Sequence, residues 1–357
     1  MAILSPVNLV RSRGLGFVDQ TSRDLRFVAG LLKKQPFHAL VQVTNRCNMR
    51  CSFCGFWPNG VAPKLELTVA DYQRLAQQMA ELGCFLVSVE GGEPLLRPDI
   101  VEIVRAFGQR HVPVLYTNGW FMNAAKAHEL FDAGVAQVGV SIDFPDAARH
   151  DKKRRLEGAF DQAWRAIDAL LAQAPHGSAQ VHVMTILMQE NQDDLETLLK
   201  MSAARGVGHC VTLISTDGFR RAKNEQDQLP EQALQQSYSA HLLDLWQRYP
   251  HFRALRDYLQ QMDAFLGQQS MPTCHAGEQS INIDHLGNVS PCIERIDSMA
   301  GNVREQPLAE ILAKMRGLEA VARCQDCWTL CRGFAQNLGQ GASVRSLMDL
   351  GSRLRSK

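Results

Sequence analysis

Strand-like and helix-like segments alternate along the chain, and this alternation limits the possible fold more than any other feature. Short apolar runs typical of buried strands lie at 37–44, 85–89, 112–116, 135–142, 181–187 and 210–215. The segments between them have helical patterns, at 68–82, after Pro98 through Phe107, and at 123–133, 158–173 and 192–205. Six such units in a row predict a parallel α/β fold. A full eight-unit barrel would need more repeats than we find.

Composition narrows the classes of protein to consider. The chain has 357 residues and 45% hydrophobic content, enough for a large barrel or for two domains. Its 38 basic and 37 acidic residues balance to a net charge of +1, which argues against nucleic acid as the main partner. No apolar run reaches membrane-span length, and Met1 to Val10 is too short, and too broken by Pro6 and Asn8, for a signal peptide. We therefore expect a cytoplasmic protein.

Three cysteines occupy the loop after the first predicted strand. Cys47, Cys51 and Cys54 follow the spacing Cys-x3-Cys-x2-Cys. Thiolates are the soft ligands that select iron–sulfur clusters, zinc or copper(I), and disulfides are rare in the cytosol. A four-iron cluster held by three cysteines keeps one iron without a protein ligand. The alternatives are a partial zinc site, or a disulfide that leaves one thiol over.

A second group of five cysteines lies near the C-terminus. The segment 281–292 reads as a β-hairpin, and it is followed by a helix after Pro307. The cysteines are Cys274, Cys292, Cys324, Cys327 and Cys331. Four sulfurs from a hairpin and a distant Cys-x2-Cys can meet at one zinc or iron–sulfur site. Cys84 and Cys210, alone in strand patterns, are expected to be core thiols.

The first cysteine group resembles that of the radical S-adenosylmethionine (SAM) superfamily, with Phe53 where the family keeps an aromatic residue. The resemblance implies a partial (β/α)6 TIM-like barrel, a four-iron cluster whose open iron chelates SAM, and reductive cleavage of SAM to a 5′-deoxyadenosyl radical. A flavodoxin- or ferredoxin-type electron donor would supply the electron.

The resemblance also implies a set of SAM contacts, each after the carboxyl end of a strand. Gly91-Gly92-Glu93-Pro94 resembles the segment for the SAM amino group, although a plain Gly-Gly turn is the alternative. Asn118 would lie near the adenosine, with a type I′ turn as the alternative. Ser141 would bind the ribose and Arg155, favoured over Arg154, the carboxylate. Asn191 fits the family as well.

Three further features of the sequence are interpreted separately. Glu90 stands where the family often has a small or apolar residue, so it is either a substrate-binding or supporting residue or a solvated strand end. Asp217 and Arg220 follow the sixth strand, where substrate contacts are expected. The basic run from Lys152 to Arg155 is interpreted as a solvated helix start.

The C-terminal cysteines resemble those of SPASM and shorter twitch domains, which hold auxiliary four-iron clusters in a small α+β fold. A full SPASM domain uses seven cysteines, whereas this chain offers five. That number favours one auxiliary cluster on Cys274, Cys292, Cys324 and Cys327. Cys331 would then replace one ligand or have a separate role, such as hydrogen donor.

We expect five regions along the chain. They are an N-terminal helical extension (1–36), the barrel (37–218), a helical linker packed on it (219–273), the auxiliary cluster domain (274–335) and a tail (336–357). The extension would cap the bottom of the barrel with Leu25, Val28, Leu31 and Leu32 on one face. In the linker, one long helix would start at Leu229-Pro230 and a second, after Pro250, would end near Leu266.

The expected function is oxidation, by dehydrogenation or cross-linking, of a small metabolite or peptide, with the auxiliary cluster as electron acceptor. A small molecule is slightly favoured, because residues 1–36 cannot hold a leader-binding module of the kind that peptide-modifying relatives carry. One alternative is an epimerase in which Cys331 donates the hydrogen. Another is a non-catalytic iron–sulfur or zinc protein.

Overall fold

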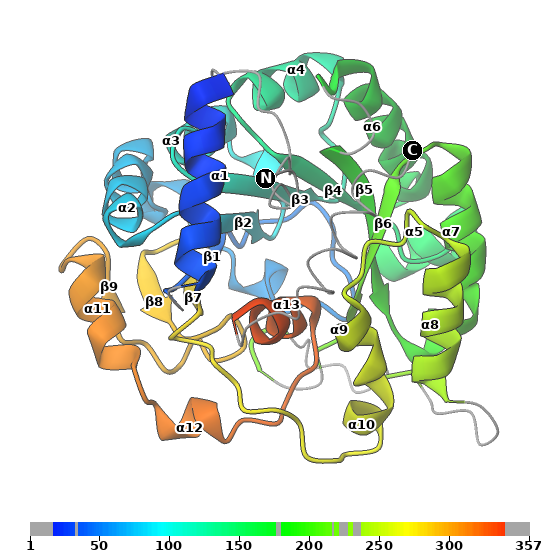
Figure 1. Ribbon diagram of the computed structural model, residues 1–357. Helices are drawn as coiled ribbons and strands as arrows, with labels where there is room; N and C mark the ends of the chain where they lie inside the picture. The colour runs from blue at the N-terminus through cyan, green and yellow to red at the C-terminus, as the bar shows by residue number, and fades with distance from the viewer. Residues whose placement is uncertain are drawn as a thin grey trace.

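A single sheet of nine strands forms the centre of the molecule (Figure 1). The computed structural model describes residues 17–32, 35–175, 180–215, 218–220, 228–230 and 237–339. The strand order is β6-β5-β4-β3-β2-β1-β7-β8-β9, with β1 to β6 parallel to their neighbours. The strands are β1 (His38–Thr44), β2 (Leu86–Gly91), β3 (Val112–Thr117), β4 (Gln137–Ser141), β5 (Val181–Leu187), β6 (Gly208–Leu213), β7 (Ser280–Ile283), β8 (Asn288–Ser290) and β9 (Gly301–Asn302). The six predicted parallel strands are confirmed.

Helices follow the strands and cover the outer face of the sheet (Figure 1). The barrel helices are α2 (Val69–Leu82), α3 (Ile100–Gly108), α4 (Ala124–Asp132), α5 (Ala147–Arg154), α6 (Ala159–Gln173) and α7 (Leu195–Ala204). The predicted N-cap of α2 is confirmed, since Thr68 and Asp71 form a reciprocal capping box. Within the described part of the chain, no helix has the length and apolar character needed to cross a bilayer.

The C-terminal cysteine domain continues the barrel sheet. β7 pairs in parallel with β1, so that His38 lies opposite Ser280, and β8 and β9 follow in antiparallel order. The hairpin predicted at 281–292 is therefore confirmed. Because β1 is shared, the loop that follows it lies close to the loops of the second cysteine group.

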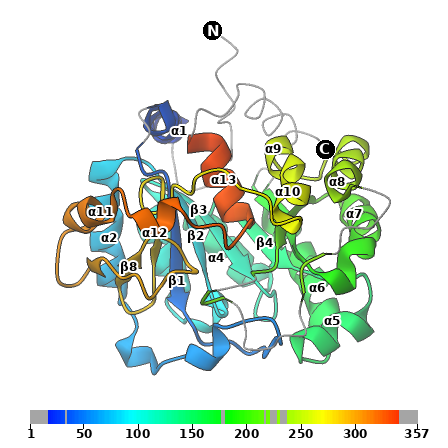
Figure 2. The ribbon, with the colours of Figure 1, turned by 90° about the horizontal axis from the view of Figure 1, so that it is seen from below.

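Two helices cap the amino-terminal ends of the strands, as Figure 2 shows. α1 (Phe17–Leu32) and α13 (Leu330–Gly339) meet in a small apolar cluster containing Phe27, Phe37, Ala335 and Leu338. The predicted capping role of the extension is confirmed, but its predicted face is wrong at Leu25, which is 64% exposed. The helix is rotated so that Phe27, which is 5% exposed, packs on the barrel instead.

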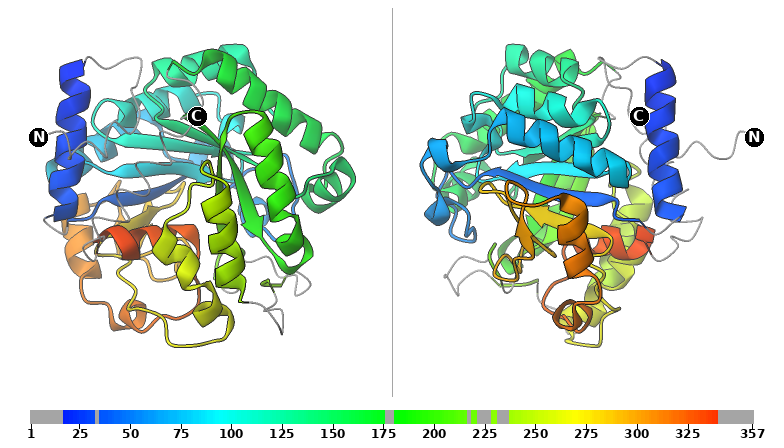
Figure 3. Two further views of the ribbon diagram at one scale, coloured as in Figure 1. Left: turned by 45° about the vertical axis from the view of Figure 1, so that its right-hand side comes forward. Right: turned by 90° about the vertical axis from the view of Figure 1, so that its left-hand side faces the viewer.

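The linker packs against the β5–β6 side of the barrel (Figure 3). It contains α8 (Tyr238–Arg248), α9 (Arg256–Gln260) and α10 (Met262–Leu266), and α11 (Leu308–Met315) and α12 (Glu319–Ala322) follow in the C-terminal domain. The predicted second linker helix is thus two short helices. The predicted start of the first linker helix lies partly outside the described residues. Asp217 and the tail beyond residue 339 lie outside them entirely.

The basic run at 152–155 ends a helix and does not start one, so that prediction is wrong. α5 has Lys152, Lys153 and Arg154 in its last turn, where cations are favourable near the negative end of the helix dipole. The run is also only partly solvated, because Arg154 is 7% exposed.

Candidate active site

The loop after β1 brings Cys47, Cys51 and Cys54 together beside the carboxyl end of the sheet. Cys51 is buried, and the other two are half-buried. The Met49 N–H donates to Cys47 Sγ at 3.4 Å, and the Cys54 N–H donates to the Cys51 carbonyl at 3.4 Å. Phe53, 7% exposed, packs in an apolar cluster with Met49 and Cys51. Its aromatic ring therefore packs against other side chains of the loop.

Burial keeps these thiols protonated in the absence of a metal. It raises the pKa of Cys47 and of Cys51 to about 12, and it raises the pKa of Cys54 in the same direction. A bound cation reverses this preference, because metal ligation requires and stabilises the thiolate. The loop is thus suited to a metal group and poorly suited to a reactive free thiol.

Gly91 and Gly92 allow the end of β2 to contact the backbone of the cysteine loop. A Cβ on Gly92 would lie 2.2 Å from the Arg46 carbonyl oxygen, and one on Gly91 would lie 2.1 Å from that of Thr44. The Gly92 N–H donates to the Thr44 carbonyl at 2.7 Å. Only glycine permits this approach at both positions. The predicted contact of this segment with the SAM amino group stays a prediction.

Glu93 organises the turns around it. Its carboxylate is fully buried and accepts from Thr117 Oγ1 at 2.8 Å, the Asn118 N–H at 2.8 Å and the Leu95 N–H at 2.9 Å. Burial raises its pKa against the opposing effect of these donors. Pro94, also buried, begins the short helical turn that follows. Glu93 therefore fixes the position of Asn118 relative to β2.

Asn118 reaches the cysteine loop directly. Its Nδ2 donates to Asn48 Oδ1 at 2.9 Å and lies 3.9 Å from Cys47 Sγ. Its Oδ1 accepts from the Trp120 N–H at 2.9 Å. This residue contacts the first cysteine group, and its predicted place near an adenosine stays a prediction.

Arg154 and Asp143 form a buried ion pair behind the cysteine loop. The Arg154 Nη2 lies 2.6 Å from Asp143 Oδ2, with side chains 8% and 0% exposed. The guanidinium also lies 5.4 Å from the centre of the Phe53 ring. Arg155, by contrast, is exposed and has φ 54° at the end of α5. Its predicted contact with the SAM carboxylate stays a prediction.

Ser141 and Asn191 lie at or just after the carboxyl ends of β4 and β5. Ser141 is half-buried at the end of β4. Asn191, 1% exposed, donates to the Asp143 and Ile186 carbonyls and accepts from the Met188 N–H, each at 2.8 Å. Asn191 thus joins the ends of β4 and β5. The predicted roles of both residues toward SAM stay predictions.

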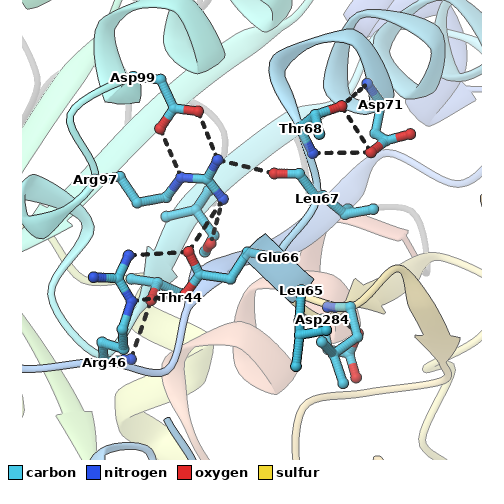
Figure 4. Close-up of polar contacts among 12 residues, drawn as sticks. Thr44, Arg46, Leu65, Glu66, Leu67, Thr68, Asp71, Arg97, Asp99 and Asp284 are labelled. Carbon is cyan, nitrogen blue, oxygen red and sulfur yellow. Dashed lines mark hydrogen bonds and ion pairs between the residues drawn. The ribbon is translucent and has the colours of Figure 1, made fainter. Parts of the chain in front are cut away.

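A buried ionic network anchors the cysteine loop to the rest of the fold, as Figure 4 shows. Glu66, 3% exposed, accepts a hydrogen bond from Thr44 Oγ1. It also accepts from Arg46 Nη2 at 3.0 Å and from Arg46 Nε at 3.1 Å. Arg97 Nη1 lies 3.7 Å from Glu66 Oε2 and binds Asp99 on its other side. No sequence motif marks this network, because its members are distant along the chain.

The five C-terminal cysteines line one pocket. Cys274 precedes β7, Cys292 follows β8, and Cys324, Cys327 and Cys331 lie before or at the start of α13. Burial raises the pKa of Cys274 and Cys292, and that of Cys327 to about 12. None of the ten cysteines, all of which lie within the described residues, forms a disulfide.

Arg332 holds the cysteine segments of this pocket together. It is 6% exposed, and its guanidinium donates to the carbonyls of Cys327 and Pro272 at 2.8 Å and to that of Cys324 at 3.1 Å. One side chain thus fixes the Cys-x2-Cys turn and the segment before Cys274. A lone arginine in a helical segment gave no sequence signal for this role.

Residues 218–220 connect the two cysteine loops. The Gly55 N–H, next to Cys54, donates to the Arg220 carbonyl at 2.9 Å. The Phe219 N–H donates to the Glu294 carbonyl at 3.3 Å, and the Arg220 N–H donates to Glu294 Oε2 at 3.0 Å. Arg220 Nη2 also lies 4.0 Å from Cys331 Sγ. Since Glu294 follows Cys292 by two positions, this segment, hereafter the bridge segment, sets the position of each loop relative to the other.

The donor chemistry of both loops fits iron–sulfur clusters. The three thiols of the first loop and the five thiols that line the pocket are soft ligands, which iron–sulfur clusters prefer. Among the described residues, no three His, Cys, Asp or Glu side chains converge tightly enough for one metal ion. A four-iron cluster needs a wider arrangement than one ion, because its ligands bind different irons.

Comparison with known proteins identifies the two parts of the chain. The profile of the Radical SAM superfamily matches residues 41–202, and that of SPASM, an iron-sulfur cluster-binding domain, matches residues 274–328. The chain contains a radical SAM domain followed by a SPASM domain. This confirms the predicted resemblance, and it assigns the cofactors as a SAM-binding 4Fe-4S cluster, SAM and auxiliary iron–sulfur chemistry in the SPASM domain.

Named relatives of this radical SAM chain have different activities. An AdoMet-dependent heme synthase of Methanosarcina barkeri is 27% identical over 307 residues, covering 80% of this chain and 86% of the relative. A GTP 3',8-cyclase of Pectobacterium atrosepticum is 30% identical over 220 residues, covering 57% and 64%. Streptococcus suis SuiB bound to S-adenosylmethionine has a TM-score of 0.60 at 15% identity, covering 86% and 73%, and SuiB has also been solved bound to precursor peptide SuiA. The structural likeness shows the shared fold.

Proposed function

We propose that this radical SAM chain oxidises its substrate by two electrons, with one auxiliary cluster in the five-cysteine pocket as the electron acceptor. The observation that carries the proposal is the bridge segment, which binds both cysteine loops through backbone hydrogen bonds. A substrate between the two loops would be close to both groups. The substrate class is a small metabolite or a peptide.

The chain's own residues would hold the cofactors. Cys47, Cys51 and Cys54 would ligate the SAM-binding cluster and leave one iron for SAM, and four of the five pocket cysteines would ligate the auxiliary cluster. When bound, the first cluster and SAM supply a carbon-centred radical that removes a hydrogen atom, and the auxiliary cluster supplies a one-electron acceptor.

In the proposed reaction the substrate is oxidised by two electrons in two steps. The substrate would lose one hydrogen atom to the 5′ carbon that is freed when the sulfur–carbon bond of SAM is cleaved by one-electron reduction. It would then lose one electron to the auxiliary cluster and one proton to a base or to water. A flavodoxin- or ferredoxin-type protein would supply the electron that starts each turnover.

Epimerisation is the second candidate, and the surroundings of Cys331 favour keeping it. Cys331 packs on a small apolar cluster of Leu40, Phe56 and Ile293, which Cys54 also contacts. Its thiol lies 3.0 Å from Thr329 Oγ1. A thiol between the two cysteine loops is suited to return a hydrogen atom to a substrate radical.

Turnover in D2O separates the two candidates. Reduced holoenzyme with SAM is incubated with a peptide pool or a small-molecule pool from the producing cells, and products are examined by mass spectrometry. Oxidation predicts a product two hydrogens lighter with no deuterium at the radical carbon. A product of unchanged composition with one deuterium, which disappears in the Cys331→Ala variant, would contradict oxidation and make Cys331 the hydrogen donor.

A further inference from the structure

Gln42, Glu90 and Tyr116 lie side by side on the inner face of the sheet. Gln42 on β1 is the register partner of Glu90 on β2. Val89 pairs with Leu115, so the next residues along β2 and β3 are Glu90 and Tyr116. Burial raises the pKa of the Tyr116 phenol, and the nearby Cys210 and Glu90 raise it further. These three side chains therefore share one level below the segment of Gly91 and Gly92.

On the β1 and β2 side of this level, two acceptor oxygens have no partner. Gln42 Oε1 and Glu90 Oε1 are buried, and neither finds a hydrogen-bond donor among the described residues. Gln42 is 0% exposed. A buried polar atom without a partner costs about 1–3 kcal/mol. Such atoms in a native structure call for a partner that the polypeptide itself does not supply.

A chain of hydrogen bonds fixes which atom Gln42 presents. Ser290 Oγ lies 3.1 Å from the Cys292 carbonyl, which can only accept, so the hydroxyl donates to it. The hydroxyl oxygen therefore accepts from Asn282 Nδ2 at 3.1 Å, which leaves Asn282 Oδ1 to accept from Gln42 Nε2 at 2.8 Å. The Gln42 amide is thereby oriented with its carbonyl oxygen free. An acceptor, and not a donor, faces the interior.

The charge on Glu90 is not compensated by its neighbours. Arg220, which lowers its pKa, and Glu294, which raises it, are the charged groups that act on it. Arg220 is already ion-paired with Glu294, and none of the described residues forms an ion pair with Glu90. Burial is the larger effect and raises the pKa of Glu90 to about 7. A cation placed here would restore the ionised form.

Aromatic rings close the β3–β5 side of the same level. Tyr116 and His182 pack edge to face with ring centres 5.9 Å apart. They meet over Gly139, where a Cβ would lie 2.6 Å from His182 Nε2 and 2.8 Å from the Tyr116 ring. Glycine at this position makes room for the two rings. Burial lowers the pKa of His182 to about 3, so its imidazole is neutral and does not repel a cation.

We propose that Gln42 and Glu90 hold a cationic nitrogen group of the substrate, with at least two N–H donors, against the ring of Tyr116. Two acceptors side by side match two donors, the free carboxylate selects positive charge, and an aromatic ring adds cation–π attraction. A carboxylate or phosphate would meet only repulsion from both oxygens. The proposal names the substrate chemistry of the proposed oxidation and rests on that function.

Binding of three small probes tests the proposal without turnover. n-Propylammonium, 1-propanol and propionate differ only in the head group, and each is titrated by calorimetry into anaerobic, cluster-loaded full-length protein with SAM. We expect n-propylammonium to bind and the other two not to bind. Equal or tighter binding of propanol or propionate would overturn the proposal. If none of the three binds, water satisfies the two oxygens and the proposal is wrong.

Variants locate the binding and provide controls. Glu90→Gln removes the charge without changing size, and we expect it to weaken n-propylammonium binding about tenfold or more. Gln42→Leu removes the second acceptor and should weaken it less. Glu102→Gln changes an exposed carboxylate of α3 and should bind like the original protein. Iron content and the melting temperature report whether each variant is folded, and undiminished binding by folded Glu90→Gln would refute the assignment.

The probe titration is independent of the proposed oxidation. If the protein binds n-propylammonium through Glu90 but makes no oxidised product, the proposed function is wrong and the binding site stands. If it oxidises a substrate but binds no n-propylammonium, the proposed function stands and the proposed cation site is wrong.

Discussion

Replacing Arg97 by methionine should strongly destabilise the fold around the cysteine loop. The Arg97 side chain is 6% exposed. Its Nη1 donates to the Val43 carbonyl at 3.0 Å and its Nη2 to the Leu67 carbonyl at 2.9 Å. Its Nε and Nη2 bind Asp99 at 2.9 and 2.7 Å. Methionine retains much of the volume and removes every donor.

The magnitude follows from what the substitution leaves behind. Glu66, with a side chain 2% exposed, would lose one of its two cations and keep Arg46 and Thr44. Two buried backbone carbonyls would also lose a donor. Removing one partner of a buried ionic network costs about 3–5 kcal/mol. At about 2 °C per kcal/mol for a chain of this size, the melting temperature should fall by roughly 6–10 °C.

Thermal unfolding of the full-length protein, followed by circular dichroism, measures this effect. Arg74→Met is the matched control, because Arg74 also pairs with an aspartate but is 58% exposed. An exposed pair contributes at most about 1 kcal/mol, so the control should lower the melting temperature by no more than about 2 °C. If the two variants melt within a degree of each other, the network does not anchor the loop as argued.

Three further predictions follow from the site. Anaerobically reconstituted protein should hold ~8 iron and ~8 sulfide per chain, and ~4 iron with stoichiometric zinc would remove the auxiliary cluster. Arg332→Met should lose the auxiliary cluster and retain ~4 iron, because its three carbonyl contacts position the cysteines, and undiminished iron would show that these contacts are dispensable. Burial raises the pKa of Glu90 from 4.5 to about 7, so its contribution to the free energy of unfolding should be fully present below pH 4.5. The free energy of unfolding should then fall by about 3 kcal/mol as pH rises through 7, and Glu90→Gln should lack this fall. Parallel urea-unfolding curves from pH 4.5 to 8 would contradict this last prediction.

The sequence predicted the elements whose signal is local. Buried strands such as β5 (Val181–Leu187) are continuous apolar runs, and the Thr68 cap stands at the start of a helical pattern. Cysteine spacing likewise marked both groups, because ligands of one cluster must be close along the chain or in paired strands.

Features that depend on distant partners could not be predicted in this way. Arg154 looked like part of a solvated basic run, yet Asp143, at the end of another element, makes it a buried ion pair. Leu25 and Phe27 both fit a helical face, and only the packing of α1 on the barrel selects Phe27. The sequence marked Arg220 only as a residue after the sixth strand and did not predict the bridge segment, since its hydrogen bonds join positions about 74 to 165 residues apart.

Reductive cleavage of SAM should depend on the first cysteine group and can be measured in a cysteine variant. The variant replaces Cys47, Cys51 and Cys54 by alanine, and Cys84→Ala, which removes a buried thiol outside both groups, is the control. Each protein is reconstituted, reduced with dithionite and mixed with SAM, and 5′-deoxyadenosine is measured by chromatography and mass spectrometry. We expect 5′-deoxyadenosine from the original protein and the control, and none from the triple variant. Formation of 5′-deoxyadenosine by the triple variant, at the rate of the original protein, would contradict this expectation.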